Sequence, residues 1–326
     1  MAVKSYAYAV GNVRAKENAL FSRTDIEMLL ACADDKAAAV FLRDKGYADA
    51  ETPLDSALII KSEEQKLWDY IKSVAPDFSV FEAFVLQNDC HNIKTVFKSH
   101  LSGTDAKDLL LFPATIEIST ILKVCTEQDF SDLPDYLRNS VKDAYDALFK
   151  AHNPQRCDLI LDATFMSRRL DTANKLSVPM LSTLIKTTVF YENIKAALRC
   201  AKAGKDADFC NMCLIDGTGV DKKTLVSAAL RGTDEVLALL ASKNEFAGHL
   251  AAEAYKTSAR EFEKFADDTL MSVVLKAKYV AVGAEPLIAY LFAKLAEIKC
   301  VRMAVNAVRI GQDSAKTREM LRKMYE

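Results

Sequence analysis

The chain has 326 residues, of which half are apolar and 27% charged, with only ten glycines and seven prolines. This composition excludes a disordered, collagen-like or loop-rich β protein, and the length exceeds what one ordinary core of about 100–200 residues organises. The formal net charge is −2, with lysines and arginines scattered among acids, which excludes the basic surface that holds nucleic acid. We expect an all-α protein of two or three folding units.

The opening residues, MAVKSYAYAV, lack the basic region and long apolar stretch of a signal peptide. The longest uncharged stretch, 176–185, is shorter than the roughly 20 residues that a membrane-spanning helix needs. The eight cysteines are spread through apolar stretches without the spacing of a disulfide framework. We therefore expect a cytoplasmic protein that reaches a membrane only through a partner.

Four short sequences recur along the chain, and in each a β-branched residue is followed by a base. They are Asn12-Val13-Arg14, Asn92-Ile93-Lys94, Asn193-Ile194-Lys195 and Cys300-Val301-Arg302. Around the last two, apolar residues recur at steps of three and four, from 180 to 201 and from 287 to 308. These patterns predict two long helices, which begin at Pro179 and Pro286.

Three polar segments, 22–27, 115–117 and 221–223, each precede an apolar stripe and predict helix starts. The repeat is longer than a tetratricopeptide or armadillo unit, which favours a tripartite helical body over an open solenoid. The alternative is that such short tripeptides recur by chance. Turns at 102–105 and 203–206, with a lesser break at 151–154, predict three helical domains at approximately 1–104, 105–204 and 205–326.

Two segments invite a chemical interpretation. The loop 217–224 has glycines, a lysine and a threonine, yet the glycine that a phosphate-binding loop needs before its lysine is missing, which favours a plain turn. Cys210 and Cys213 have CxxC spacing, but zinc needs a second ligand pair and the sequence has no matching one. We expect no catalytic residue, no metal and no cofactor.

Two aspartate pairs keep an enzyme alternative open. Asp34-Asp35 and Asp267-Asp268 invite comparison with the magnesium-diphosphate sites of helical isoprenoid synthases, although the third carboxylate that would hold the cation is absent from both. Helix caps or solvated faces are the competing interpretation. A free-standing helical interaction scaffold is a further alternative.

The bases of the recurring sequences are candidate partner-binding residues. Arg14, Lys94, Lys195 and Arg302 either face solvent like any helical charge or present equivalent bases to an acidic helical partner.

Both ends of the chain resemble a known family. The stretches GAEPLIAYLFAK at 283–294, EIKCVR at 297–302, YAYAVGNVRAKE at 6–17 and TREMLR at 317–322 are similar to the C subunits of bacterial and archaeal V-type ATPases, whose eukaryotic counterpart is the d subunit. The sequence departs from that family at Cys300, where an asparagine or similar polar residue is usual, and near Leu295, where the family has an acid.

The resemblance implies a funnel of three similar helical domains around a pseudo-threefold axis, seated on the cytoplasmic face of the membrane rotor ring. Its wide mouth would receive the axle subunits, and it would pass torque between axle and ring without hydrolysing ATP. One copy per complex is implied, and a monomer when isolated.

Overall fold

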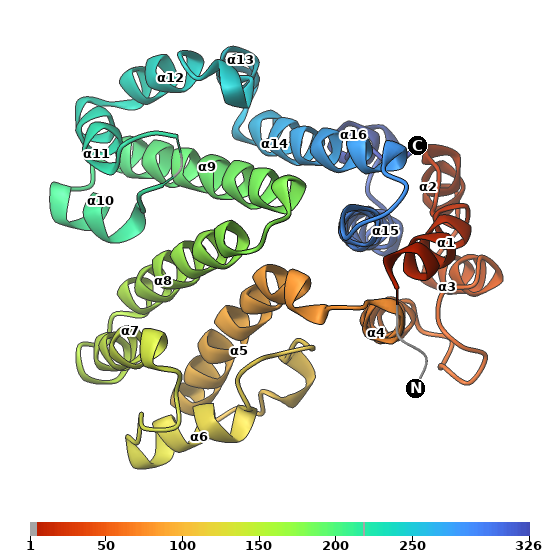
Figure 1. The fold of residues 1–326 in the computed structure, drawn as a ribbon, viewed down its shortest axis with the longest axis horizontal. Helices are drawn as coiled ribbons and strands as arrows, with labels where there is room; N and C mark the ends of the chain where they lie inside the picture. Colours follow the sequence, from red (N-terminus) through yellow and green to blue (C-terminus); the bar gives the residue numbers. More distant parts are fainter. Residues whose placement is uncertain (1–4, 218) are drawn as a thin grey trace. The chain divides into compact units, whose positions relative to one another are not determined.

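The computed structural model describes residues 5–217 and 219–326, and this part of the chain contains helices and no strand (Figure 1). The predicted all-α class is confirmed. The α-helices are α1 (Tyr6–Glu17), α2 (Arg23–Leu30), α3 (Asp35–Asp44), α4 (Ser56–Val74), α5 (Glu82–Ser102), α6 (Ile118–Glu127), α7 (Asp135–Tyr145), α8 (Pro154–Lys175), α9 (Pro179–Lys202), α10 (Ala207–Cys213), α11 (Lys222–Arg231), α12 (Thr233–Ala241), α13 (Gly248–Thr257), α14 (Ala259–Val274), α15 (Glu285–Arg309) and α16 (Ser314–Met320).

Short helical turns join several of these helices. Four are 3-10 turns, η1 (Phe78–Phe81), η2 (Lys107–Leu109), η4 (Asn244–Phe246) and η5 (Leu275–Tyr279), and one is a π turn, η3 (Asp146–Lys150). Among the helices described, none is both long and apolar enough to cross a membrane.

The helices predicted from sequence form where local signals placed them. Pro179 and Pro286 each lie in the first turn of a long helix, α9 and α15, where a missing N–H costs nothing. Helix α2 begins with a capping box, in which Ser22 accepts from the Asp25 N–H and the Asp25 carboxylate accepts from the Ser22 N–H. These helices therefore start where the sequence predicted, and the proline and capping-box signals are the reason.

Contacts divide the chain into two compact units. The first consists of the described part of Met1–Val80 together with Glu253–Glu326, and the second is Phe81–Ala252. The predicted turns at 102–105 and 203–206 contain the ends of α5 and α9, where Gly103 and Gly204 adopt left-handed φ angles of 68° and 58°. The division into domains 1–104, 105–204 and 205–326 stays a prediction.

In the second unit α8 packs against both α5 and α9 (Figure 1). A core of buried side chains joins α5, α6, α7 and α8, and it includes Phe97, Leu137, Leu161 and Phe165. Because these side chains come from different helices, burying them requires the helices to pack against one another.

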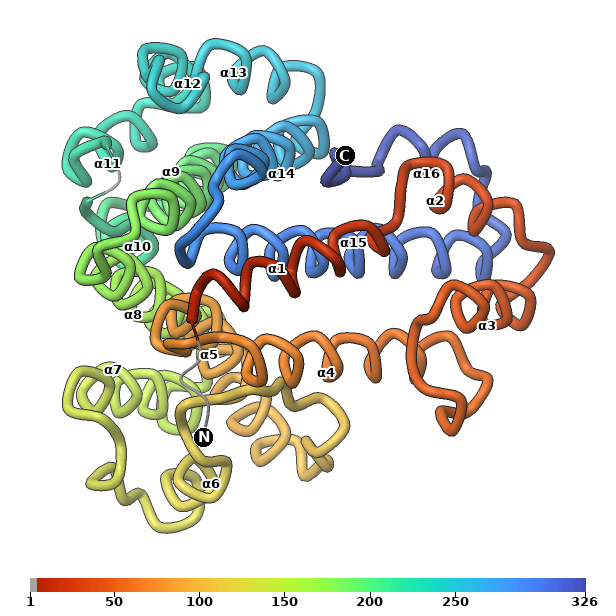
Figure 2. The backbone as a smooth tube through the Cα atoms, turned by 45° about the vertical axis from the view of Figure 1, so that its right-hand side comes forward, coloured from red at the N-terminus to blue at the C-terminus, as the bar shows by residue number. Residues whose placement is uncertain are grey.

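In the first unit α15 is the central element. Helices α1, α2, α4 and α14 all contact it, and α1 and α4 run alongside it in Figure 2. Leu287, Leu291, Ile298 and Val301 of α15 are at most 2% exposed. A helix that is apolar on most faces must be surrounded, which explains its position.

The order of elements repeats three times. Each repeat begins with a long helix, which is followed by a short helical turn or helix, a non-helical segment and two further helices. This order is seen in α5–η2–α6–α7 and again in α9–α10–α11–α12. The third repeat begins with α15, α16 and the non-helical segment 321–326. Its next helices are α2 and α3, because the Arg23 N–H donates to Glu326 Oε1 at 2.5 Å and so holds the end of this segment at the start of α2.

The segment 321–326 should contribute strongly to the stability of the first unit. Leu321 is 2% exposed, and its replacement by alanine should lower the free energy of unfolding by about 2–5 kcal/mol. The exposed Lys316 offers a matched control, because Lys316→Ala should change the free energy of unfolding by less than about 0.5 kcal/mol. Urea unfolding of the full chain measures both, and equal midpoints would contradict the assigned role.

Candidate functional site

Asn92, in the first recurring sequence on α5, holds the chain that follows α5. Its side-chain Nδ2 donates to the Leu111 carbonyl oxygen at 2.9 Å, and its Oδ1 accepts from the Leu111 N–H at 2.8 Å. Asn92 is fully buried, so these two bonds satisfy main-chain groups that no strand could pair.

Asn193 on α9 makes the same pair of bonds in the second repeat. Its Nδ2 donates to the Ile215 carbonyl oxygen at 2.8 Å, and its Oδ1 accepts from the Ile215 N–H at 3.2 Å. The matched residues of the recurring sequences thus have the same task. We call this arrangement of Asn92 with Leu111, and of Asn193 with Ile215, the amide clamp.

In the third repeat Cys300 of α15 takes the place of the asparagine. Burial raises the pKa of its thiol, while the main-chain N–H of Arg322 acts in the opposite direction. Arg322 lies 22 residues after Cys300, the same separation as between Asn193 and Ile215. The thiol therefore faces the equivalent segment but cannot form the two-bonded clamp.

A carboxylate stands three residues before the clamp position in two repeats. Asp89 accepts from the N–H groups of Thr115 and Ile116 at 2.8 and 3.1 Å, and Glu297 accepts from the N–H of Phe21 at 2.7 Å. Ile116 and Phe21 each directly precede the N-cap residue of the next helix. Burial raises the pKa of Asp89 although these bonds oppose the rise.

Glu297 also belongs to a buried ionic network in the first unit. Lys294 Nζ contacts Glu297 Oε1 at 2.6 Å and Glu63 Oε1 at 2.9 Å, and the Tyr47 hydroxyl donates to Glu297 Oε1. All four residues are at most 9% exposed. Burial, followed by the neighbouring Glu297 charge, raises the pKa of Tyr47 well above its usual range.

The four bases predicted to bind partners are each paired with an acid of their own unit. Lys94 contacts Asp162 at 2.5 Å, Lys195 contacts Glu192 at 2.8 Å and Arg302 contacts Glu64 at 2.5 Å. These three bases occupy matched places on the long helices. The Arg302 side chain is 49% exposed, whereas those of Lys94 and Lys195 are 19% and 28% exposed.

Arg14 differs from the other three bases. Its guanidinium contacts Glu17 at 2.7 Å and donates to the carbonyl oxygens of Ala277, Lys278 and Val280 at 2.6–3.2 Å. It thereby satisfies carbonyl groups at the end of η5. The structure gives Arg14 a role in holding α1 and η5 together.

The cysteines have a packing role. Cys210 and Cys213 are buried, and the Cys213 Sγ lies 4.0 Å from the Cys200 Sγ. Within residues 5–217 and 219–326, no three side chains of histidine, cysteine, aspartate or glutamate form a group that would hold a metal ion.

The two aspartate pairs are engaged in the fold. Asp34 caps α3 through the Ala37 N–H at 2.7 Å, and Asp35 accepts from the Ser56 hydroxyl at 2.6 Å. Asp267 contacts Lys299 and Arg322, while Asp268 accepts from the Lys323 N–H at 2.6 Å. Only Asp34 is a helix cap, because Asp35 lies in the first turn of α3 and Asp267 and Asp268 lie within α14.

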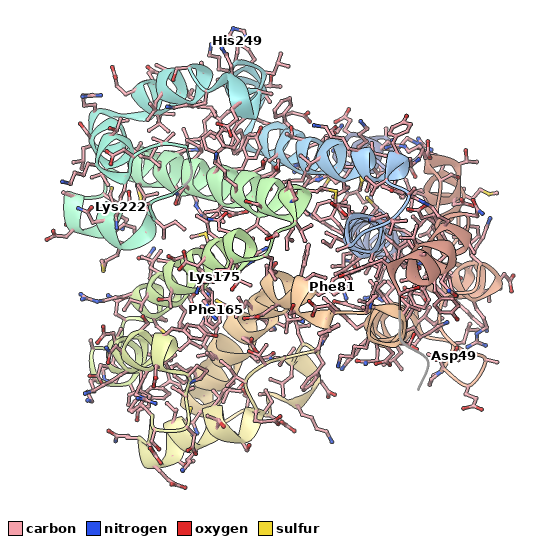
Figure 3. All side chains as sticks on the ribbon, viewed as in Figure 1. Asp49, Phe81, Phe165, Lys175, Lys222 and His249 are labelled. Atoms are coloured by element: carbon pink, nitrogen blue, oxygen red, sulfur yellow. The ribbon has the colours of Figure 1, made fainter. Side chains whose placement is uncertain are left out.

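The loop 217–224 includes Thr218, which lies outside the described residues. Its end is a helix start, because Asp221 accepts from the Thr224 N–H at 2.9 Å and α11 begins at Lys222 (Figure 3).

Sequence reasoning missed the acids Asp89 and Glu297, although the aligned repeats contain the signal for both. Each stands three residues before the clamp position in its copy. It also missed the pairing of Glu63 with Lys294, since nothing in the local sequence relates α4 to α15.

Known protein sequences match nearly the whole chain. The sequence profile of the ATP synthase (C/AC39) subunit family matches residues 9–320. The C subunit of the V-type sodium ATPase of Enterococcus hirae is 22% identical over 269 residues, which cover 82% of this chain and 82% of that protein.

Removal of one amide clamp should destabilise the second unit. Asn92→Ala leaves the partly buried N–H and C=O of Leu111 without their partner, which should cost roughly 1–4 kcal/mol of unfolding free energy. Asn211→Ala is the control, because Asn211 is exposed and bonds only within its own helix. Chemical unfolding compares the two, and equal losses would refute the clamp.

The buried Tyr47 should make the first unit sensitive to alkali. Tyr47→Phe removes a hydrogen bond to a charged group and should cost about 1.5–3 kcal/mol at pH 7. Because the folded pKa is raised, Tyr47 favours folding below its unfolded pKa of about 10, and this contribution is lost as the pH rises above it. The difference in unfolding free energy between wild type and variant should therefore be about 1.4 kcal/mol smaller at pH 11 than at pH 7. Urea unfolding at both pH values measures it, and a constant difference would contradict the expectation.

Proposed function

Because the chain belongs to the ATP synthase (C/AC39) subunit family, we propose that it is the central-stalk connector of a V-type rotary ATPase, coupling the axle subunits to the membrane rotor ring. The observation that carries this proposal is the match of the family profile to residues 9–320. The resemblance seen in the sequence of both ends is thereby confirmed. The chain is a structural subunit of the ATPase and not an enzyme, and its part in ion transport follows from the complex.

A connector must transmit torque without bending, and the fold supplies stiff elements. Helices α4, α5, α8, α9 and α15 are 19–25 residues long and pack side by side within their units. Side chains in such cores are closely packed and transmit strain. Amide clamps and buried ion pairs fix the segments between the helices, so that little of each unit is free to yield.

The repeats support a proposed arrangement of three similar domains in a funnel around one pseudo-threefold axis. Each repeat has a long helix and a non-helical segment that leads to the next helix, and two of them share the same clamp. Three similar surfaces would meet a ring of identical subunits through repeated weak contacts, whose combined strength exceeds that of any one.

The partners follow from the same proposal. The axle subunits would enter the mouth of the funnel, and the rotor ring would lie beneath it at the cytoplasmic face of the membrane, with one copy of the chain per complex. The E. hirae relative is described as part of a sodium ATPase. Either direction of coupling, ATP-driven ion transport or ion-driven ATP synthesis, uses the connector in the same way.

Among the predicted contact bases, Arg302 is the best placed for a partner. Its side chain is the most exposed of the four, and its pairing acid, Glu64, lies on the neighbouring helix α4. We include Arg14, Lys94 and Lys195 among the proposed contact residues, and Arg14 also donates to the carbonyl groups at the end of η5.

Affinity purification tests the proposed function directly. The tagged full chain is captured from gently solubilised membranes, and the accompanying proteins are identified by mass spectrometry. Catalytic-head, axle and rotor-ring subunits should appear in defined stoichiometry. Recovery of the chain alone from the soluble fraction would instead favour a free-standing scaffold, and diphosphate turnover that depends on Asp35 and Asp268 would favour the helical enzyme.

Charge reversal tests the contact role of Arg302. Arg302→Glu should reduce assembly and coupled ATPase activity by roughly tenfold, because it places an acid opposite an acidic partner. The double variant Arg302→Glu with Glu64→Arg restores the internal ion pair. Its free energy of unfolding should therefore return to within about 1 kcal/mol of the wild-type value. Since the partner would still meet an acid at position 302, assembly should remain impaired. Full recovery of assembly by the double variant would assign Arg302 a purely internal role.

A further inference from the structure

A cavity of about 380 Å³ lies within the unit Phe81–Ala252, among side chains of α5, α8 and α9. Leu159, Phe165 and Met166 of α8 give it an apolar wall, and Figure 3 labels Phe165 on that helix. Basic side chains from α8 and α9 also line it, namely Arg169, Lys195 and Arg199. An apolar pocket with a few converging polar groups is the usual form of a small-molecule site.

The acids of the cavity are already neutralised. Asp162 accepts from Lys94 Nζ at 2.5 Å, and Glu192 is paired with Lys195 at 2.8 Å. Among the described residues no acid forms an ion pair with Arg169 or Arg199, although the charge of Glu192 acts on Arg169. The cavity therefore carries positive charge in excess of its own carboxylates.

Arg169 is the most unusual of these groups. The residue is only 9% exposed, and its Nε donates to the Ala83 carbonyl oxygen at 2.8 Å. Its two terminal nitrogens have no hydrogen-bond partner among the described residues. Burial lowers the pKa of Arg169, yet a guanidinium does not lose its proton in a protein, so the charge stays.

A buried charge is costly unless a partner of opposite charge compensates it. The fold anchors the guanidinium by one nitrogen, and Arg169 is one of the residues that line the cavity. Two parallel N–H groups of a guanidinium match the two oxygens of a carboxylate or phosphate group. The geometry of Arg169 thus fits an oxyanion better than it fits water.

We propose that this cavity is an oxyanion-binding site, in which Arg169 holds a carboxylate or phosphate group and Arg199 adds positive charge. The volume leaves room beside the oxyanion for a small apolar attachment against Leu159 and Phe165. The oxyanion comes either from a free small anion or from a carboxylate of a partner subunit, since both present the same two oxygens. The site does not depend on the connector role.

Inorganic phosphate and succinate are the probes. Each is titrated into the isolated full chain at constant ionic strength, with chloride as the replaced anion, and binding is followed by calorimetry and by the midpoint of thermal unfolding. A saturable signal is expected for at least one probe. A response no larger than that to chloride would overturn the proposal.

Two variants assign the binding to the cavity. Arg169→Gln should abolish saturable binding, and Arg199→Gln should weaken it about tenfold through the loss of one charge. Arg199 is exposed, so its variant keeps the test valid if Arg169→Gln does not fold. Arg156→Gln is the control, because Arg156 is an exposed arginine of α8 outside the cavity lining. Equal affinity in wild type, Arg199→Gln and Arg156→Gln would refute the site.

The source of the oxyanion is decided by repeating the phosphate titration with the purified ATPase complex. If a partner carboxylate fills the cavity, the binding that depends on Arg199 is present in the isolated chain and lost in the complex. If the ligand is a free anion, it is present in both. Because the first titration needs no partner, it can fail while purification of the complex succeeds, and the reverse also holds.

Discussion

The fold depends on satisfying main-chain groups where the chain is not helical. An all-α protein has no strands to pair the N–H and C=O groups of a buried extended segment, and each unpaired group costs about 1–3 kcal/mol. Asn92 and Asn193 solve this problem with a side-chain amide that offers one donor and one acceptor, like a piece of main chain. Once each segment is held against its long helix, the start of the following helix is positioned as well. The packing of α6 and α11 then follows.

The third repeat lacks the amide, because Cys300 cannot supply one. It keeps the buried carboxylate: Glu297 accepts from the N–H before α2, as Asp89 does before α6, and Lys294 compensates the charge of Glu297. A buried carboxylate needs such compensation, which explains why Glu63 and Tyr47 surround the same ion pair. The repeats therefore agree in geometry more than in residue type.

Local rules made much of the fold predictable. Proline in a first turn, apolar residues at steps of three and four, and the capping box at Ser22 act within a few residues, and α2, α9 and α15 form where they were expected. The family resemblance was also visible in the sequence, at both ends of the chain and in its repeat. By contrast, the exposure of Arg302, the burial of Arg169 and its bond to Ala83 depend on helices brought together over long separations. Periodicity within one helix contains no information about which neighbour covers it.

The third repeat is assembled from both ends of the chain, and this has a consequence for the order of synthesis. A ribosome releases α2, α3 and α4 early, but their central partner α15 emerges only after the whole unit Phe81–Ala252 has been made. The later-made unit is one continuous stretch of chain and can fold as it leaves the ribosome. The earlier helices must wait with the faces that α15 covers exposed until α15 has been made. In the nascent chain α2, α3 and α4 are therefore open to aggregation and to chaperones for longer than the helices of the later unit.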